Sequence, residues 1–478
     1  MNGQLVPDPA ALGRWILGWV QPGGAVHGFH NHSIWGSNPY RCLDFTSGHT
    51  TFAAPLVLGL LNVLRGRPDE RGRALVRRLV EYQAGSVQPD GQYDHIGFQV
   101  GDTLRLGLIH NAVPNVALAY ALRHAPELLG PELCGRVAAR VRDSLAVLDR
   151  LYPNEKPGSG TCNQEYARTW ARLLYAEATG EAAPRERARR EINQFIADFH
   201  RPGYPDAASA GVLREANNPN YIEPAEYYGL IIPPLLLAAR MFGDPSLAEA
   251  ALSLGRHIVR SSWTDARGQA RLHRAWQTVG GRKLKTTEPM CISGSGLTLW
   301  GLHELQALAP AENFEPFLEA FARTYANYQH PAGFFTAGSG WHSELDIAPC
   351  TAWETHDFAY LTAAGPVAPD FWDRFFSPAP PRLAVMLGDS CTYLERGAHW
   401  AIDDYFTTDT FQLRGRKDRD WFGRDQPKWI PNAKHLPDEL AFPDRPVFIR
   451  TPAGIEWVRG GDPGAMDVML ATGEIWRP

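Results

Sequence analysis

Long apolar runs are missing from this chain of 478 residues. No stretch reaches the roughly 18 uninterrupted apolar residues that a membrane-spanning helix needs. The first twenty residues, MNGQLVPDPAALGRWILGWV, lack the basic segment, apolar core and cleavage site of a secretory signal. The six cysteines are widely scattered and show none of the paired spacings of zinc or redox sites. We therefore expect a reduced, cytoplasmic protein with no membrane partner.

An excess of one charge is also missing. Lys and Arg number 47 and Asp and Glu 52, and both signs are interspersed, so no nucleic-acid partner is expected. The local exception is the basic run from Gly281 to Lys285, which is either a solvated loop or an anchor for an anionic substrate group. No glycine-rich phosphate loop, nucleotide fingerprint or serine nucleophile elbow is present, so we expect no cofactor.

Apolar residues recur at helical spacing, with breakers at the ends, in six pairs of segments. The pairs are 49–64 with 69–86, 101–124 with 131–151, 163–179 with 184–199, 222–242 with 245–260, 293–308 with 312–328, and 350–364 with 369–376. Within a pair the link is only a few residues, so the two helices form an antiparallel hairpin. The links between pairs are long, and if the hairpins stack side by side these links emerge at one end: 87–100, 152–162, 200–221, 261–292 and 329–349.

Composition favours one large body. The chain is 44% hydrophobic and 21% charged, which is enough to bury a large core. The proline-rich segment 365–382 marks a domain boundary, and short β-like stretches rich in turns follow it. We predict a domain over 1–376 and a small irregular or β appendage over 377–478 that packs on it.

The number of hairpins and the placement of the long links over 1–376 resemble the six-hairpin (α/α)6 toroids of carbohydrate-active enzymes. The resemblance implies a mainly α fold with a funnel for sugars at one end of the ring, and catalytic residues at the ends of the inner helices. Such toroids include glycoside hydrolases, polysaccharide lyases and epimerases, so the activity must be argued from the site. Several link aromatics suit sugar rings, which have one apolar face: Trp35, Tyr40, Tyr93, Tyr204, Tyr221, Trp263, Trp276 and Trp341.

The first polar cluster runs from His27 to Trp35. Its three histidines lack a matched carboxylate or cysteine partner elsewhere, so we predict no metal site. The piece Asn31-His32-Ser-Ile-Trp35 resembles a stretch of the alginate lyase type of (α/α) enzyme, Asn-Asn-His-Ser-Tyr-Trp. That resemblance implies that Asn31 neutralises a uronate and that His32 assists proton abstraction. Trp35, an aromatic residue of the same segment, is a candidate substrate-binding residue.

The second and third clusters follow in the next links. Asp94 and His95 are candidate binding residues, whereas the preceding Pro-Asp-Gly at 89–91 is turn chemistry and structural. In the segment 214–228, Asn220 is expected to cap a helix beginning near 222, and Glu223 to favour its N-terminal dipole. The remaining polar residues exceed what capping requires and are candidates for sugar binding or acid and base chemistry: Arg214, Glu215, Asn218, Tyr221 and Glu226.

The fourth and fifth clusters lie in the last two long links. The fourth contains His273 and Arg274, with Lys283, Lys285 and Glu288 further along. The fifth crowds charged residues at the entry of the sixth hairpin, and we expect at least one of its carboxylates to be functional: Trp341, His342, Glu344, Asp346, Glu354, His356 and Asp357.

Two chemistries fit these residues. Glycoside hydrolysis needs a carboxylic acid with a raised pKa and a second carboxylate, which Glu215 or Glu226, facing Glu354 or Asp357, would supply. Elimination from a uronate needs charge neutralisation, a base and an acid, for which the candidates are Asn31, His32, Tyr221, His273 and Arg274. We place hydrolysis of a uronic-acid-containing oligosaccharide first, because carboxylates are abundant in the links. An epimerase with two histidines and a noncatalytic binding scaffold remain further alternatives.

Overall fold

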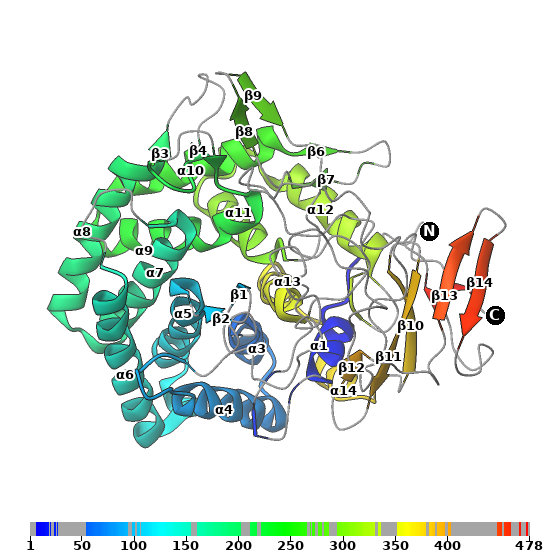
Figure 1. The fold of residues 1–478 in the computed structure, drawn as a ribbon. Helices are drawn as coiled ribbons and strands as arrows, with labels where there is room; N and C mark the ends of the chain where they lie inside the picture. The colour runs from blue at the N-terminus through cyan, green and yellow to red at the C-terminus, as the bar shows by residue number, and fades with distance from the viewer. Residues whose placement is uncertain are drawn as a thin grey trace.

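The structure is a computed structural model, shown in Figure 1. Beyond residue 378 it describes the backbone of strands alone. The described residues are 6–18, 20, 23–24, 26, 54–93, 98–100, 103–105, 107–153, 160–201, 211–217, 221–264, 268, 270–272, 276–279, 282–285, 294–329, 333–335, 351–378, 382–387, 390–396, 400–402, 447–451, 454–459, 468–469 and 475–476.

The six predicted hairpins are confirmed. Each pairs an inner helix with an outer one: α3 (Pro55–Gly66) with α4 (Glu70–Gly85), α5 (Leu108–His124) with α6 (Pro126–Leu151), α7 (Cys162–Thr179) with α8 (Ala182–Phe199), α9 (Ile232–Phe242) with α10 (Pro245–Ser261), α11 (Gly296–Leu308) with α12 (Glu315–Tyr328), and α13 (Thr351–Ala363) with α14 (Phe371–Phe375). A 3-10 helix, η2 (Ala225–Leu230), precedes α9.

The inner helices form a closed ring. Starting from α3, contacts run through α5, α7, η2 with α9, α11 and α13, and α13 returns to α3 (Figure 1). The inner and outer helices differ in burial. The inner helix α5 is buried at every residue from Leu108 to Leu122, whereas the outer helix α10 buries only the face that packs on the ring. The mainly α toroid predicted from the sequence is therefore confirmed.

Local sequence sets the helix ends. Asp69 and Asp244 cap α4 and α10 by accepting from the backbone N–H groups of Gly72 and Ser246. At the other ends, α7 and α9 stop at Gly180 and Gly243, which adopt the left-handed conformation that glycine tolerates. These signals keep the links between paired helices short.

A further helix, α1 (Pro9–Leu17), packs against α13 and α14. Its Trp15 is completely buried, and the indole N–H donates to Glu354 across the junction at 2.9 Å. The sequence predicted only that this segment is not a secretory signal, and it did not predict a helix here. It is instead a helix with a buried face that packs on the last hairpin.

The long links lie at the N-terminal ends of the inner helices, as expected, but they contain strands that periodicity did not predict. The residues before α5 form a hairpin of β1 (Phe98–Val100) and β2 (Thr103–Arg105), so the helix predicted from residue 101 begins at Leu108. Further pairs are β3 (His200–Arg201) with β4 (Gly211–Val212) and β6 (Trp263–Thr264) with β7 (Ala270–Arg271). β5 (Tyr221–Ile222), β8 (Trp276–Val279) and β9 (Arg282–Lys285) form a small sheet that joins two links.

The C-terminal strands form one mixed sheet, in the order β14-β13-β11-β10-β15-β16, with β12 paired to β11. The strands are β10 (Arg382–Leu387), β11 (Ser390–Arg396), β12 (Trp400–Ile402), β13 (Val447–Thr451), β14 (Gly454–Arg459), β15 (Val468–Met469) and β16 (Ile475–Trp476). The pairing of β10 with β15 is parallel and the others are antiparallel. The β character expected after residue 376 is present, and the domain boundary itself stays a prediction.

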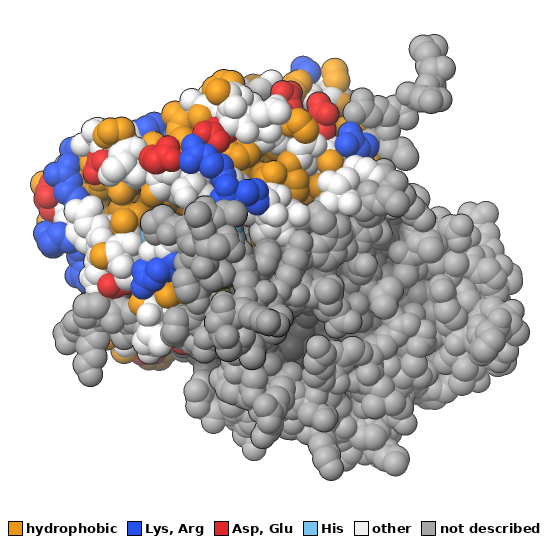
Figure 2. All heavy atoms as spheres, turned by 90° about the horizontal axis from the view of Figure 1, so that it is seen from above, with side chains coloured by type: hydrophobic (Ala, Val, Ile, Leu, Met, Phe, Trp, Pro, Cys, Tyr) orange, Lys and Arg blue, Asp and Glu red, His pale blue; other side chains and the backbone are white. Residues whose placement is uncertain are grey.

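Charges of both signs alternate over the described part of the face shown in Figure 2. This agrees with the near balance of acidic and basic residues in the sequence. Among the residues that the structure describes, no helix has the length and apolar character to cross a membrane.

Candidate functional site

Buried polar side chains collect where the inner helices begin. Asn163 of α7 is 4% exposed, Glu223 and Glu226 before α9 are 1% and 2% exposed, and Glu354 and Asp357 of α13 are fully buried. Burying so many polar groups is unfavourable unless each is hydrogen-bonded or has a functional role. The partners of each group therefore decide which of them are candidates.

Glu223 is the group whose contacts best suit chemistry. Its backbone N–H donates to Val212, and its Oε1 accepts from the Asn163 amide at 2.8 Å. The Arg214 guanidinium lies 3.7 Å from the same oxygen. Within the described part of the chain, no donor reaches the second oxygen, Oε2. One carboxyl oxygen is thus held in place while the other has no described partner.

Burial raises the pKa of Glu223 to about 7, against the opposing effect of Arg214. The thiol of Cys162 is fully buried nearby, and burial raises its pKa well above the usual value, with the charge of Glu223 adding to the shift. A carboxylic acid that is protonated near neutral pH can donate that proton, which a carboxyl of ordinary pKa cannot do.

Glu226 is positioned by η2. The Thr298 hydroxyl of α11 donates to the backbone oxygens of Ala225 and Glu226, each at 2.9 Å, and accepts from Gly229 N–H at 2.8 Å. Glycine is required at 229, since a Cβ there would lie 2.4 Å from the backbone of α11. This close docking holds Glu226 three residues after Glu223, and the two carboxyls interact electrostatically.

Glu354 and Asp357 are occupied by hydrogen bonds that hold elements together. Glu354 accepts from Trp15 Nε1 and from the Phe335 backbone N–H, both at 2.9 Å, and burial raises its pKa to about 8. Asp357 accepts from the backbone N–H groups of Gly294 and Gly296 at 2.8 and 3.0 Å, and from the Tyr325 hydroxyl. The catalytic roles predicted for both stay predictions, and these contacts assign them a structural role.

His356 lies between these two carboxylates in sequence and is 4% exposed. Burial lowers its pKa to about 3, so the ring is neutral at ordinary pH. A second buried histidine, His110, lies in the first turn of α5 and is 1% exposed. Both rings therefore belong to the end of the toroid where the long links emerge.

Two further candidates lie in the turn after β4. Arg214 is mostly buried and faces Glu223, whereas its neighbour Glu215 is partly exposed. The other predicted site residues lie outside the described residues: Asn31, His32, Trp35, Asp94, His95, Asn218, His273, Arg274, Trp341 and His342. Tyr221 is described by its backbone alone, as part of β5. Their roles stay predictions.

The segment 90–93 of the second cluster is structural in both of its parts. The turn at Asp90 is structural as predicted, because Asp90 accepts from the Gln92 backbone and Gly91 has a φ of +90°. Tyr93, grouped with the link aromatics, is fully buried instead and donates to Asn115 at 2.6 Å. It is a core residue that anchors the link to α5.

The helix predicted to begin near 222, with Glu223 at its N-terminal dipole, is wrong in its start, because residues 221–222 form β5 and α9 begins at Ile232. Asn163 and Cys162 were not among the residues selected from the sequence. The available signal was the polar start of α7, Cys-Asn-Gln-Glu, directly after a long link. The pairing itself joins residues 60 positions apart, which no local pattern specifies. Among the described residues, no group of three or more His, Cys, Asp or Glu side chains could hold a metal ion.

No protein-family model matches this chain, and no curated protein matches it. Solved structures do share its fold. A D-mannose isomerase aligns with a TM-score of 0.50 at 11% identity, over 74% of this chain and 95% of the other. The chain has the fold of the (α/α)6 carbohydrate-active enzymes. A sugar epimerase from a ruminal bacterium aligns with a TM-score of 0.48 at 12% identity, over 73% of this chain and 94% of the other. A family 88 glycosyl hydrolase from Bacteroides vulgatus aligns with a TM-score of 0.45 at 10% identity, over 68% of this chain and 92% of the other.

Proposed function

We propose that this toroid is a carbohydrate-active enzyme that hydrolyses a glycosidic bond in a uronic-acid-containing oligosaccharide, with Glu223 as the general acid. The observation that carries the proposal is the environment of Glu223. Its carboxyl is buried, its pKa is raised to about 7, and one oxygen is fixed by Asn163 while the other has no partner among the described residues. A structural carboxylate is expected to have both oxygens satisfied.

The chemistry assigns one task to each carboxyl. Glu223 gives its proton to the leaving glycosidic oxygen as the bond from that oxygen to the anomeric carbon breaks. Glu226 accepts a proton from a water molecule, whose oxygen forms the new bond to the same carbon. Arg214 provides a positive charge beside this pair, suited to the carboxylate of a uronate. This replaces Glu354 and Asp357 in the predicted acid and base pair, since their oxygens hold Trp15 and α11.

Elimination remains the alternative that the link residues suggest, with His32, Tyr221 and Arg274 as the residues to test. An epimerase that uses two histidines is favoured by one observation: His110 and His356 are both buried at the same end of the ring, and His356 is neutral, as a base must be. A noncatalytic scaffold and a cytoplasmic location are the remaining untested predictions.

The experiment follows reducing ends and the ultraviolet absorbance of unsaturated uronate rings during incubation with neutral oligosaccharides, uronate oligosaccharides and unsaturated derivatives. New reducing ends without a gain in absorbance support hydrolysis, and loss of absorbance indicates hydrolysis of an unsaturated uronide. A gain in absorbance establishes elimination instead. Isomerised sugar without new ends supports the epimerase, and no turnover of any substrate favours the scaffold.

Variants assign the reaction to residues. We expect Glu223→Gln to lower kcat by about 10²- to 10⁴-fold, because the amide keeps the shape of the side chain but cannot protonate the leaving oxygen. The matched control is Glu319→Gln, an exposed glutamate of the outer helix α12. Equal activity of Glu223→Gln and the control would refute the assignment of the acid.

A further inference from the structure

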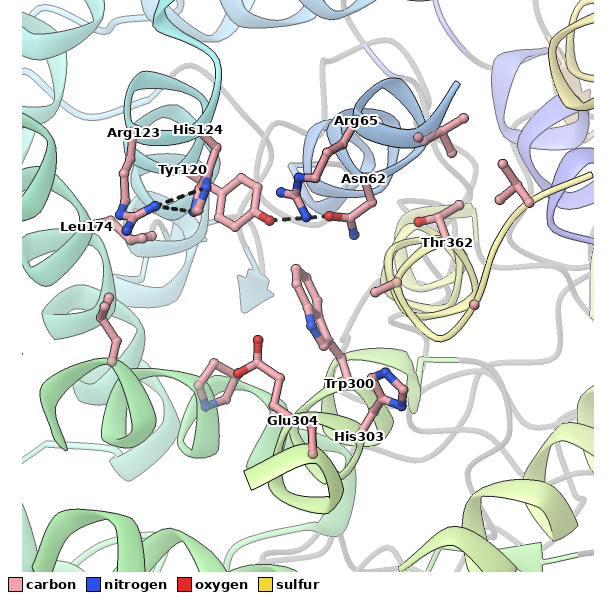
Figure 3. Close-up of a pocket in the computed structure, with 18 of the residues that line it drawn as sticks. Asn62, Arg65, Tyr120, Arg123, His124, Leu174, Trp300, His303, Glu304 and Thr362 are labelled. Atoms are coloured by element: carbon pink, nitrogen blue, oxygen red, sulfur yellow. Dashed lines mark hydrogen bonds between the residues drawn. The ribbon is translucent and has the colours of Figure 1, made fainter. Parts of the chain in front are cut away.

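The toroid has a second mouth at the end where the short links lie. A cavity of about 840 Å³ opens there, between the C-terminal halves of the inner helices α3, α5, α7, α9, α11 and α13 (Figure 3). Its lining includes none of the residues that the proposed hydrolysis uses. The volume is within the range of roughly 300–1,000 Å³ found for small-molecule sites.

Three aromatic rings form part of the wall of this cavity. Tyr120 and Trp300 are each 7% exposed and Trp170 is 4% exposed, and all three line the cavity. The Tyr120 and Trp300 rings meet edge to face at a centroid distance of 6.2 Å, and the Tyr120 hydroxyl donates to Asn62 at 3.3 Å (Figure 3). These fixed ring faces, with polar groups at their edges, suit a pyranose.

The rim carries an excess of positive charge. Four arginines line the cavity against two glutamates: Arg65, Arg67, Arg123 and Arg240 with Glu177 and Glu304. Arg123 forms an ion pair with Glu177, so its charge is compensated. Burial raises the pKa of Glu304, and Arg240 opposes that shift. Arg65 and Arg240 are exposed, and they approach the cavity from α3 and α9, on different sides of the ring.

We propose that this second mouth is a binding site for a small anionic sugar, a hexose that bears a carboxylate or a phosphate. The sugar ring lies against Trp300 and Tyr120, and Arg65 and Arg240 bind the anionic group. Guanidinium groups suit this task because their planar donors match carboxylate and phosphate oxygens. The site is additional to the hydrolytic one proposed above and does not depend on it, since it is formed at the opposite ends of the same helices.

Isothermal titration calorimetry on the full chain tests the proposal with four probes: glucuronate, glucose 6-phosphate, glucose and inorganic phosphate. We expect saturable binding of glucuronate or glucose 6-phosphate, at least about tenfold tighter than glucose or inorganic phosphate. Whichever anionic sugar binds more tightly distinguishes a carboxylate from a phosphate ligand. The double variant Arg65→Gln with Arg240→Gln should weaken that binding by at least about tenfold.

The matched control is Arg190→Gln, an exposed arginine on the outer helix α8, which should bind as the unsubstituted protein does. Thermal unfolding of each variant verifies that the toroid is intact. The proposal is overturned if neither anionic sugar binds, or if the double variant binds as tightly as the control, since the ligand would then occupy another site. It is also overturned if inorganic phosphate binds as tightly as glucose 6-phosphate, because the aromatic walls would then contribute nothing.

Discussion

Removing the carboxylate of Asp357 separates a structural from a catalytic role. This fully buried side chain accepts from two backbone N–H groups at the start of α11, those of Gly294 and Gly296, and from the Tyr325 hydroxyl of α12. In Asp357→Ala all three donors lose this acceptor in a fully buried site. A buried donor left unsatisfied costs about 1–3 kcal/mol, so we expect a loss of about 3–6 kcal/mol after partial relaxation.

That loss is large beside the net stability of about 5–15 kcal/mol typical of folded domains. It should appear in differential scanning calorimetry as a drop in Tm of about 3–8 °C. Asp357→Asn keeps the shape and one acceptor oxygen, but turns an amide N–H toward another donor, and should lose about 2–3 kcal/mol. Tyr325→Phe removes one donor together with its need for an acceptor, and should cost only about 1 kcal/mol.

The order of these three effects is the test. A structural role requires Asp357→Ala to be the most destabilising and Tyr325→Phe the least. If Asp357→Ala unfolded at the temperature of the unsubstituted protein and yet lost turnover, the reasoning from hydrogen bonds would be refuted. The carboxylate would then be catalytic, as its position in the fifth sequence cluster had suggested.

Three other predictions follow from burial. Burial lowers the pKa of His356 from 6.5 to about 3, so between these values the unfolded chain binds a proton that the folded chain does not. The free energy of unfolding therefore falls as the pH drops through that window. The urea midpoint should fall between a pH above the window and a pH inside it, and this fall should be smaller for His356→Gln than for the unsubstituted protein. A Cβ at Gly296 would lie 2.1 Å from the His356 carbonyl oxygen, so Gly296→Ala should destabilise the protein by about 1–3 kcal/mol or more in thermal unfolding. The control is Gly135→Ala on α6, where a Cβ would meet open space, and it should stabilise the protein by roughly 0.5–1 kcal/mol. Arg172→Ala should cost about 1–3 kcal/mol in urea unfolding, because it removes a buried guanidinium that binds Asp149 and Glu191, although both carboxylates keep Arg187 as a partner. Arg142→Ala removes a side chain that is 61% exposed and should change the stability by no more than about 0.5 kcal/mol.

The ring could be predicted from the sequence because each hairpin carries its own local signals. Helical periodicity, the caps Asp69 and Asp244 and the stop at Gly243 all act within a few residues, and they specify the pairs one at a time. Boundaries were less accurate where a link folds on its own. The hairpin of β1 and β2 displaces the start of α5 from residue 101 to 108. Its strands are only three residues long, which is too short for their alternation to be distinguished from a helical pattern.

The site was predicted less well because its contacts are not local. Asn163 reaches Glu223 across 60 positions, and Trp15 reaches Glu354 across 339. Residue type alone could not show that Glu354 is occupied by an indole N–H while Glu223 keeps one oxygen without a described partner. The polar clusters therefore indicated the end of the ring where the long links emerge, but not which carboxyl has the environment of an acid.

The direction of the inner helices gives the two mouths opposite electrostatic character. Their N-terminal ends carry partial positive charge and favour ionised carboxylates, so the raised pKa of Glu223 arises from burial against the local field. A substitution that lets water reach Glu223 should lower the pKa of this carboxyl, so that it loses its proton at neutral pH. At the other mouth the partial negative charge favours arginine in the last turn, where Arg65 and Arg240 lie. That favourable interaction is worth only about 0.3–1 kcal/mol at an exposed site, so replacing these arginines should leave the fold intact and report on ligand binding alone.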